Sequence, residues 1–130
     1  MKLLLDTHVA LWAISEPERL PPPIREAVAD PANDVFVSVV SLWEIAIKHG
    51  LGRGSTGMPV SAARALERFD EVGFSVLTMT AQHAVTVEAL PAHHTDPFDR
   101  LIVAQALSEP MRLLTHDVAL ARYSDTVILF

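Results

Sequence analysis

Short apolar runs alternate with segments of helical pattern along the whole chain of 130 residues. The apolar runs are typical of buried strands and cover residues 3–5, 35–39, 74–78, 112–115 and 127–129. Segments with helical spacing or capping signals separate them, at residues 7–14, 24–29, 41–49, 61–70, 80–90 and 98–107, with a short helix after Asp117. Strands that alternate with helices form βαβ units, so the sequence predicts an α/β fold around a parallel sheet of about five strands.

The breaks between these segments are short. Pro17 and the prolines at 21–23 interrupt the chain after the first helix, and Gly54, Gly57 and Pro59 mark a loop. No internal repeat, low-complexity tract or linker is long enough to divide the chain. Half of the residues are hydrophobic, which suffices for one core at this length, so residues 1–130 are expected to form a single domain.

The composition narrows the classes of protein. The chain has no cysteine, which excludes disulfides and thiolate metal sites and fits a reducing cytoplasm. The apolar start is too short for a signal peptide, and the longest uncharged run, residues 72–87, carries several polar side chains, so we expect a cytoplasmic protein without a membrane span. The net charge of −6 argues against a broad basic surface for nucleic acid, but metal-ligating acids also count as negative, so a metal-dependent nuclease is compatible with it.

Four acidic residues lie where a predicted strand gives way to a helix. Asp6 follows the first strand and Asp117 the fourth, whereas Glu44 and Asp99 are expected in the first turns of helices. In a parallel α/β sheet such junctions meet at the carboxyl edge, so acids more than a hundred positions apart would share one crevice. Carboxylates gathered there repel one another unless divalent cations hold them together.

Each of these acids also has a structural explanation. Asp6 and Asp117 could cap the helices that follow them. Glu44 follows Ser41 at the spacing of a capping box, and Asp99 could complement the dipole of its helix. Caps do not require an acid at every junction, however, because Ser, Thr and Asn serve equally well. The joint pattern therefore favours a functional cluster.

The ligand type indicates the chemistry. Carboxylate oxygens are hard ligands that suit Mg²⁺, with Mn²⁺ as a substitute. One such cation can lower the pKa of a bound water, and a second can stabilise the leaving oxygen of an in-line displacement. The pattern is therefore typical of a metal-dependent enzyme that cleaves phosphodiester bonds. Thr7 and Thr115 lie next to the proposed ligands, where their hydroxyls could orient a water or a carboxylate, or satisfy local backbone groups.

Weaker patterns surround the third acid. Arg100 directly follows Asp99, so it could contact a phosphate or pair with Asp96 on the surface. His93 and His94 are adjacent on a predicted loop, where their side chains point in different directions, and the spacing is not that of a zinc site. We interpret each of them as a surface or core histidine.

Aromatic and basic residues near the predicted site leave alternatives open. Trp12 and Trp43 could stack on bases, or pack in the core or in a dimer interface. His116 directly precedes the fourth acid and could face the site. Basic residues near the glycine-rich loop form either a phosphate-contacting edge or a solvated face; they are Lys48, Arg53, Arg64 and Arg68.

With these residues assembled, the chain resembles the PIN-domain family, and within it the VapC-type toxin ribonucleases. The resemblance covers nearly the whole length and rests on four blocks in order, at residues 4–8, 38–48, 93–106 and 113–117. It implies that the metal-binding and catalytic acids are Asp6, Glu44, Asp99 and Asp117. The resemblance favours Asp99 over Asp96 because Asp99 stands just before the Leu-Ile-Val-Ala segment, separated from it by Arg100, as the acid of the family does.

The resemblance also implies an architecture and a biological role. The expected fold has three layers, with helices on both sides of the parallel sheet, and the expected assembly is a homodimer. The expected activity is Mg²⁺-dependent endonucleolytic cleavage of RNA, as the toxin of a toxin–antitoxin pair. The cognate antitoxin would block the site, and an acidic site suits a basic antitoxin segment.

Other functions compete with this one. A non-catalytic module that binds protein or RNA would be favoured by the loss of one of the four acids, and none is missing. A phosphatase with Asp6 as nucleophile usually needs a second aspartate two residues later, where this chain has His8. DNA stays an alternative substrate, because metal-assisted attack on phosphorus needs no 2′-hydroxyl.

Overall fold

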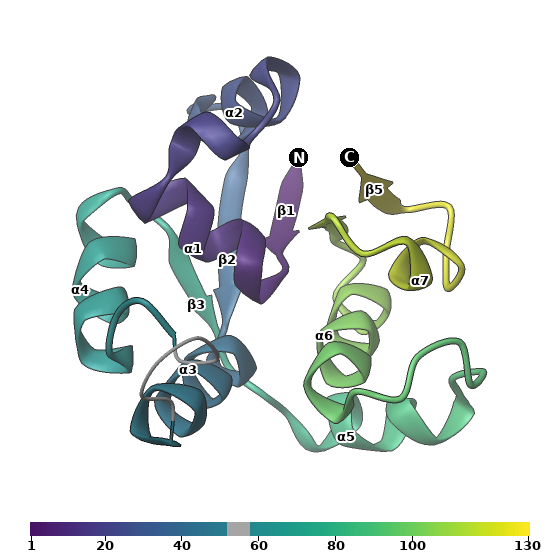
Figure 1. Ribbon diagram of the computed structural model, residues 1–130. Coiled ribbons are helices and arrows are strands. Elements are labelled where there is room, and N and C mark those ends of the chain that lie inside the picture. Colours follow the sequence, from purple (N-terminus) through teal and green to yellow (C-terminus); the bar gives the residue numbers. More distant parts are fainter. Residues whose placement is uncertain (52–57) are drawn as a thin grey trace.

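The computed structural model describes residues 1–51 and 58–130 (Figure 1). The predicted loop glycines Gly54 and Gly57 and the basic residue Arg53 lie outside these residues. The strands are β1 (Lys2–Leu5), β2 (Asp34–Ser38), β3 (Ser75–Leu77), β4 (Arg112–Thr115) and β5 (Val127–Leu129). The helices are α1 (Thr7–Ser15), α2 (Pro22–Ala29), α3 (Val39–Leu51), α4 (Ala62–Glu71), α5 (Ala81–Thr86), α6 (Pro97–Ser108) and α7 (Val118–Ala121), with 3₁₀ turns η1 (Pro17–Arg19) and η2 (Val87–Ala89).

The strands form one parallel sheet in the order β3-β2-β1-β4-β5. Leu4 of β1 pairs with Phe36 on one side and Leu113 on the other. The chain winds outward from β1 through β2 to β3, then crosses back to β4 on the opposite side of β1. This reversal makes the carboxyl ends of β1 and β4 the topological switch point, the place where parallel α/β sheets bind ligands.

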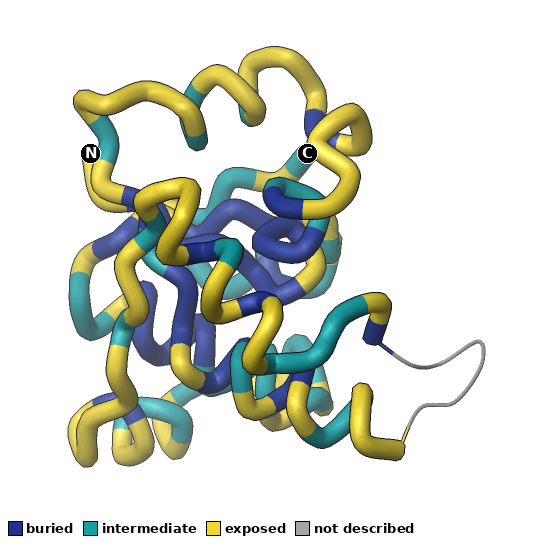
Figure 2. The backbone as a smooth tube through the Cα atoms, turned by 90° about the vertical axis from the view of Figure 1, so that its left-hand side faces the viewer, coloured by how far each residue is buried: buried dark blue, intermediate teal, exposed yellow. Residues whose placement is uncertain are grey.

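Alternate residues of β1 enter two hydrophobic clusters, one on each face of the sheet. Leu3 and Leu5 pack with Phe69 in a cluster built largely from α1 and α4. Leu4 packs on the other face with Ile102 and residues of α6 and α7. Buried residues gather on the central strands while exposed ones lie on the outer helices (Figure 2). The predicted three-layer fold, with a central five-stranded parallel sheet, is confirmed.

The start of α3 differs from the prediction. The helix begins at Val39, because the hydroxyl of Ser38 accepts the backbone N–H of Val40 at 2.9 Å and ends the strand. Glu44 is therefore beyond the first turn in which it was predicted, and the capping box considered as its structural explanation does not form. The hydroxyl of Ser41 instead lies 2.8 Å from that of Thr7.

The helix predicted over residues 80–90 is shorter and ends in a 3₁₀ turn. Thr80 and His83 form a capping box at its start, with the Thr80 hydroxyl accepting from the backbone of His83 and the His83 ring accepting from the backbone of Thr80. The α-helix ends at Thr86 and η2 follows. None of the helices in the described ranges is long and apolar enough to cross a membrane.

Candidate metal and active site

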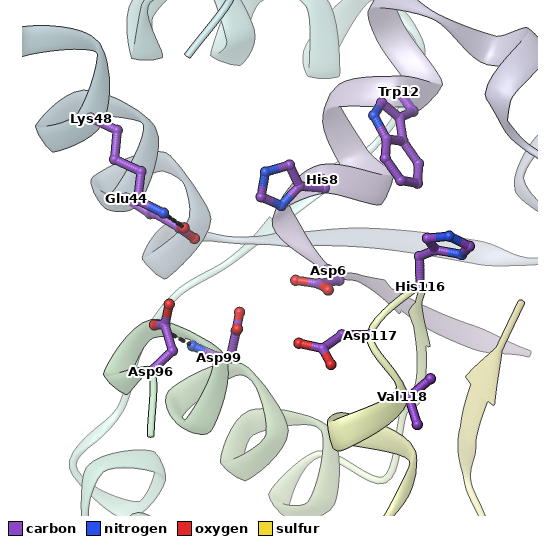
Figure 3. Close-up of a pocket in the computed structure, with 10 residues that line it drawn as sticks. All are labelled: Asp6, His8, Trp12, Glu44, Lys48, Asp96, Asp99, His116, Asp117 and Val118. Carbon is purple, nitrogen blue, oxygen red and sulfur yellow. Dashed lines mark hydrogen bonds and ion pairs between the residues drawn. The ribbon is translucent and has the colours of Figure 1, made fainter. Parts of the chain in front are cut away.

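A pocket of about 530 Å³ opens at the switch point of the sheet (Figure 3). Ten residues line it: Asp6, His8, Trp12, Glu44, Lys48, Asp96, Asp99, His116, Asp117 and Val118. All four predicted acids are among them, brought from the ends of β1 and β4 and from helices α3 and α6. Figure 3 shows the carboxylates of Asp6, Asp99 and Asp117 pointing toward one another.

Asp6 is buried at the end of β1, where it also caps α1. One carboxylate oxygen accepts the backbone N–H of Thr7 at 2.7 Å. The other accepts the hydroxyl of Thr115 at 2.7 Å, which ties β1 to β4. Burial raises the pKa of Asp6, although these two hydrogen bonds oppose the rise. The carboxylate is thus fixed in position but costly to keep charged.

Glu44 enters the pocket from the second turn of α3 and is buried. Its carboxylate accepts the Thr7 hydroxyl at 2.8 Å and the Lys48 ammonium at 2.6 Å. Thr7 has one hydroxyl hydrogen and donates it to Glu44. Ser41 is therefore the donor in the hydrogen bond between the hydroxyls of Ser41 and Thr7. Burial would lower the pKa of Lys48, but the hydrogen bond and charge of Glu44 raise it overall. Thr7, like Thr115, holds a carboxylate, which is one of the two roles expected for it.

Asp99 lies in the first turn of α6, whose cap Asp96 accepts the backbone N–H groups of Phe98 and Asp99. Burial and the nearby negative charges of Asp6, Asp96 and Glu44 raise the pKa of Asp99 to about 7. His94 contacts one carboxylate oxygen of Asp99 at 3.2 Å. Within the described part of the chain the second oxygen has no hydrogen-bond donor.

Asp117 caps α7 by accepting the backbone N–H of Ala119 at 2.9 Å. Its other oxygen lies 2.9 Å from Nε2 of His94, the same nitrogen that contacts Asp99. The sequence interpretation had missed this role by reading His94 as a surface or core histidine. The sequence did contain a signal for this role of His94. His94 lies two residues before Asp96, the cap of α6, so its side chain is close enough to reach Asp99 in the first turn of that helix.

The ring of His94 is oriented by the backbone. Nδ1 accepts the N–H of Asp96 at 2.9 Å, so Nδ1 carries no hydrogen and Nε2 must carry the hydrogen of the ring. Nε2–H therefore donates to Asp117, and an oxygen of Asp99 lies 3.2 Å from the same nitrogen. Although His94, Asp99 and Asp117 place potential ligand atoms within 4.8 Å of one another, the imidazole has no free lone pair for a cation in this arrangement.

The structure does not place Arg100, the possible phosphate-contacting residue, among those that line the pocket. Neighbouring helical residues point about 100° apart, so Arg100 faces away from Asp99 and from the pocket. Its guanidinium donates to the hydroxyl of Tyr123 and to the carbonyl oxygens of Val87, Leu90, Pro91 and His94. The pair predicted with Asp96 as the alternative is not formed either, because Asp96 caps the helix.

The remaining candidates separate into two groups. Trp12, His116 and Lys48 line the pocket, whereas Trp43 does not and packs edge-on against Phe98 at 5.1 Å between ring centroids. Arg64 and Arg68 form ion pairs on the exposed face of α4, with Glu67 and Glu71. They therefore match the solvated-face alternative, while Arg53 lies outside the described residues.

The pocket has the properties of a divalent cation site. Carboxylate oxygens converge in it, and burial together with the neighbouring negative charges raises the pKa of both Asp6 and Asp99. The available oxygen of Asp99 faces the same space. Hard oxygen donors of this kind fit Mg²⁺ or Mn²⁺.

Fold and site together define a parallel α/β domain with an acidic pocket at its switch point. Residues 3–125 match the PIN domain family, and the chain therefore belongs to that family. The chain is 35% identical over 118 residues to Ribonuclease VapC22 of Mycobacterium tuberculosis, and the match covers 88% of this chain and 86% of that protein.

Solved structures share the fold. VapBC2 from Rickettsia felis, bound to a DNA fragment from its promoter, matches with a TM-score of 0.70 and 17% identity over 100% of this chain and 98% of the other. DNA-bound VapBC from Salmonella typhimurium matches with a TM-score of 0.68 and 18% identity over 100% and 97%. The resemblance seen in the sequence is thus confirmed at the level of family and fold.

Proposed function

We propose that this chain is a metal-dependent endoribonuclease and the toxin of a toxin–antitoxin pair. The observation that carries the proposal is the convergence of Asp6, Glu44, Asp99 and Asp117 on one pocket of a PIN domain. The relative at 35% identity is named a ribonuclease, which supports RNA as the substrate class.

The four acids would hold Mg²⁺, with Mn²⁺ as a substitute. With a divalent ion held by these acids, the site would have the means to lower the pKa of a water molecule and to balance the charge that develops on the phosphodiester. Hydrogen bonds fix the orientation of three of the acids: Thr115 donates to Asp6, Thr7 to Glu44, and His94 to Asp117. Such supporting hydrogen bonds orient ligands and reduce the cost of assembling the site.

The partners follow from the same relatives. VapBC structures resemble this fold over its whole length, which supports a protein partner corresponding to the antitoxin. The acidic pocket favours an antitoxin segment that brings a basic side chain to it. A homodimer and a cytoplasmic location belong to the same proposal.

A non-catalytic binding module is the second candidate. It would not need a pocket lined by acids of which three accept hydrogen bonds from hydroxyl or imidazole donors. The phosphatase alternative is disfavoured by His8, which stands in the pocket where a second carboxylate would be required.

The test is cleavage of total cellular RNA by the partner-free protein with Mg²⁺, Mn²⁺ or EDTA. We expect cuts at discrete sites with either metal, none in EDTA, and a loss of orders of magnitude in Asp6→Asn. Asp70→Asn, which removes an exposed carboxylate from α4, is the matched control and should retain full activity. Single-stranded DNA of the cleaved sequence tests the alternative substrate.

Identical cleavage patterns from the wild type and Asp6→Asn would show that the activity is a contaminant. An absence of cleavage from folded, partner-free protein would favour the binding module. Addition of the antitoxin, expected to be a small basic protein encoded beside this one, should abolish the cleavage in proportion to its amount.

A further inference from the structure

One side of the acidic pocket is built of aromatic rings that the proposed cleavage chemistry does not use. His8 and Trp12 are one turn apart on α1, and His116 follows β4. The Trp12 ring centroid lies 6.4 Å from that of His8 and 5.7 Å from that of His116. All three residues line the pocket, and we call them the aromatic wall.

Contacts behind the aromatic wall hold its rings in place. Phe130, at the end of the chain, packs against His116 with ring centroids 5.3 Å apart, and its carbonyl oxygen pairs with Nδ1 of His116. Arg19 places its guanidinium 4.5 Å from the centroid of Trp12. Rings that are already ordered lose little conformational entropy when a ligand binds to them.

The aromatic wall is open to solvent. His8 and His116 are exposed, while Trp12 is partly buried against the core. The core gains nothing from exposed imidazoles, so packing does not explain why these rings gather at the mouth of the pocket. Figure 3 shows Trp12 and His116 on the side of the carboxylates opposite Lys48.

We propose that the aromatic wall is a nucleobase subsite, which stacks the base of a nucleotide adjoining the phosphate held at the carboxylates. This inference rests on the proposed function, since the acids must bind a phosphodiester for its neighbour to reach the wall. A single cavity of about 530 Å³ connects the acids with the wall. Aromatic side chains stack on the faces of all four bases, so such a subsite tolerates different sequences.

Charge favours a nucleotide over an apolar protein segment as the occupant. Lys48 lines the pocket on the side of the acids away from Trp12, so a cation stands in the pocket wall opposite the rings (Figure 3). A polyanionic backbone that crosses the acids from the aromatic wall would meet this ammonium group, which an apolar protein segment would not use. The base must also be unpaired to reach the wall, so the substrate would be single-stranded or looped RNA.

The test compares the binding of fluorescein-labelled hexaribonucleotides with that of a hexamer of the same sugar–phosphate backbone without bases. Fluorescence anisotropy is measured in Ca²⁺, and the integrity of each oligomer is checked on a gel. We expect oligo-A and oligo-U to bind roughly 5- to 150-fold more tightly than the base-free hexamer, as stacking of one base would give.

Variants locate the effect on the aromatic wall. Trp12→Leu and His116→Ala should bring the affinity ratio close to 1, and the exposed position of His116 protects the test if Trp12→Leu fails to fold. Trp43→Leu is the matched control, because Trp43 is exposed and outside the pocket, and should leave the ratio unchanged. In Trp43→Phe, Trp12 is the only tryptophan of the chain, so quenching of its fluorescence by a hexamer reports direct contact.

The outcomes separate this inference from the proposed function. If the protein cleaves RNA but binds base-bearing and base-free hexamers equally well, the nucleobase subsite is overturned and the nuclease function stands. The aromatic wall would then be assigned to contact with a protein partner. Base-dependent binding that requires Trp12, without any cleavage, would keep the subsite and overturn the nuclease. An unchanged ratio in both wall variants would also overturn the subsite.

Discussion

At the scale of single residues, capping and site formation are not alternatives in this chain. Asp6 caps α1 with one oxygen while the other is held by Thr115, and Asp117 caps α7 while it accepts from His94. A helix start directly after a parallel strand puts both its free N–H groups and its cap at the carboxyl edge of the sheet. The residue that caps such a helix is therefore already at the ligand site.

His94 provides the first residue-scale prediction. Removal of its Nε2–H donor in His94→Ala leaves Asp99 and Asp117 without the group that holds them together, so the affinity for Mn²⁺ should fall by about 10- to 100-fold. His94→Gln places an amide N–H near the position of Nε2 and should restore part of that affinity. Isothermal titration calorimetry of the three proteins measures both effects.

Bound Mn²⁺ also tests whether His94 is a metal ligand or only a hydrogen-bond donor to the acids. Because Nδ1 accepts from the backbone, the imidazole should not ligate the metal, and electron spin-echo spectra of bound Mn²⁺ should lack coupling to a directly coordinated imidazole nitrogen. A nitrogen coupling that disappears in His94→Ala would show that His94 is a ligand and that the ring has reoriented.

Asp99 provides the second prediction. Its folded-state pKa is raised to about 7, so the proton favours folding, and this contribution is present below about pH 4 and lost as the pH rises through about 7. Asp99→Asn cannot ionise and escapes that loss. Without metal it should be more stable than the wild type at pH 8 by about 1 kcal/mol or more, roughly 4 °C in Tm.

Thermal unfolding in EDTA at pH 4 and pH 8 measures the difference, with Asp70→Asn as the control for removal of an exposed carboxylate. The advantage of Asp99→Asn should shrink toward pH 4. Equal Tm values at pH 8 would mean that the charge of Asp99 is compensated in the metal-free protein.

At the scale of elements, the site depends on how segments are fastened to one another. Thr7 links the start of α1 to Glu44 on α3, and Thr115 links β4 to the end of β1. Arg100 on α6 donates hydrogen bonds to carbonyl oxygens of η2 and of the loop that follows η2. This loop contains His94. The helix that presents Asp99 therefore also positions the donor that holds it.

Arg100 accordingly provides the element-scale prediction. Arg100→Met removes a donor from the carbonyl oxygens of Val87, Leu90, Pro91 and His94 and should destabilise the protein by about 2–4 kcal/mol. Hydrogen exchange should quicken in residues 87–94, and Mn²⁺ affinity should fall as His94 loses its position. If Arg100→Met instead raised the KM for RNA and left hydrogen exchange and stability unchanged, Arg100 would contact a phosphate, as the sequence suggested.

At the scale of the whole molecule, the sheet order creates the site. Placing β4 beside β1 brings Asp117 to Asp6, and α3 and α6 then supply Glu44 and Asp99 around the same opening (Figure 3). This arrangement brings like charges close together, which destabilises the fold. Hydrogen bonds from hydroxyl and imidazole donors and the ammonium group of Lys48 offset part of the repulsion. A bound cation would remove most of the remaining repulsion.

Metal binding should therefore stabilise the whole fold. At a concentration of Mg²⁺ a hundred times its Kd, linkage gives about 2.7 kcal/mol, or roughly 10 °C in Tm at pH 8. The gain should be smaller at pH 6, because Asp99 then holds a proton that the cation must displace. Differential scanning fluorimetry with Mg²⁺ and EDTA measures this, and an equal shift in Asp6→Asn would place the ion elsewhere.

Much of the fold was predictable from local patterns. Each strand was expected within one or two residues of its position, since an apolar run bounded by turn residues carries its own signal. The start of α3 was misplaced because Val39 and Val40 favour a strand locally, and only the hydroxyl of Ser38 shows that the helix has begun. The helix after Thr80 was predicted too long because Arg100, which lies on another element, donates to the carbonyl oxygens of Val87 and Leu90 at η2.

The sequence by itself determined the parallel α/β class and the positions of the four acids, because strand ends and helix starts are local patterns and their convergence is a general property of parallel sheets. The tertiary structure decided the role of His94, the direction of Arg100 and the meeting of His8, Trp12 and His116 beside the acids. These features depend on contacts between residues far apart in the chain. No local pattern encodes such contacts, because a side chain's surroundings are set only when the elements pack.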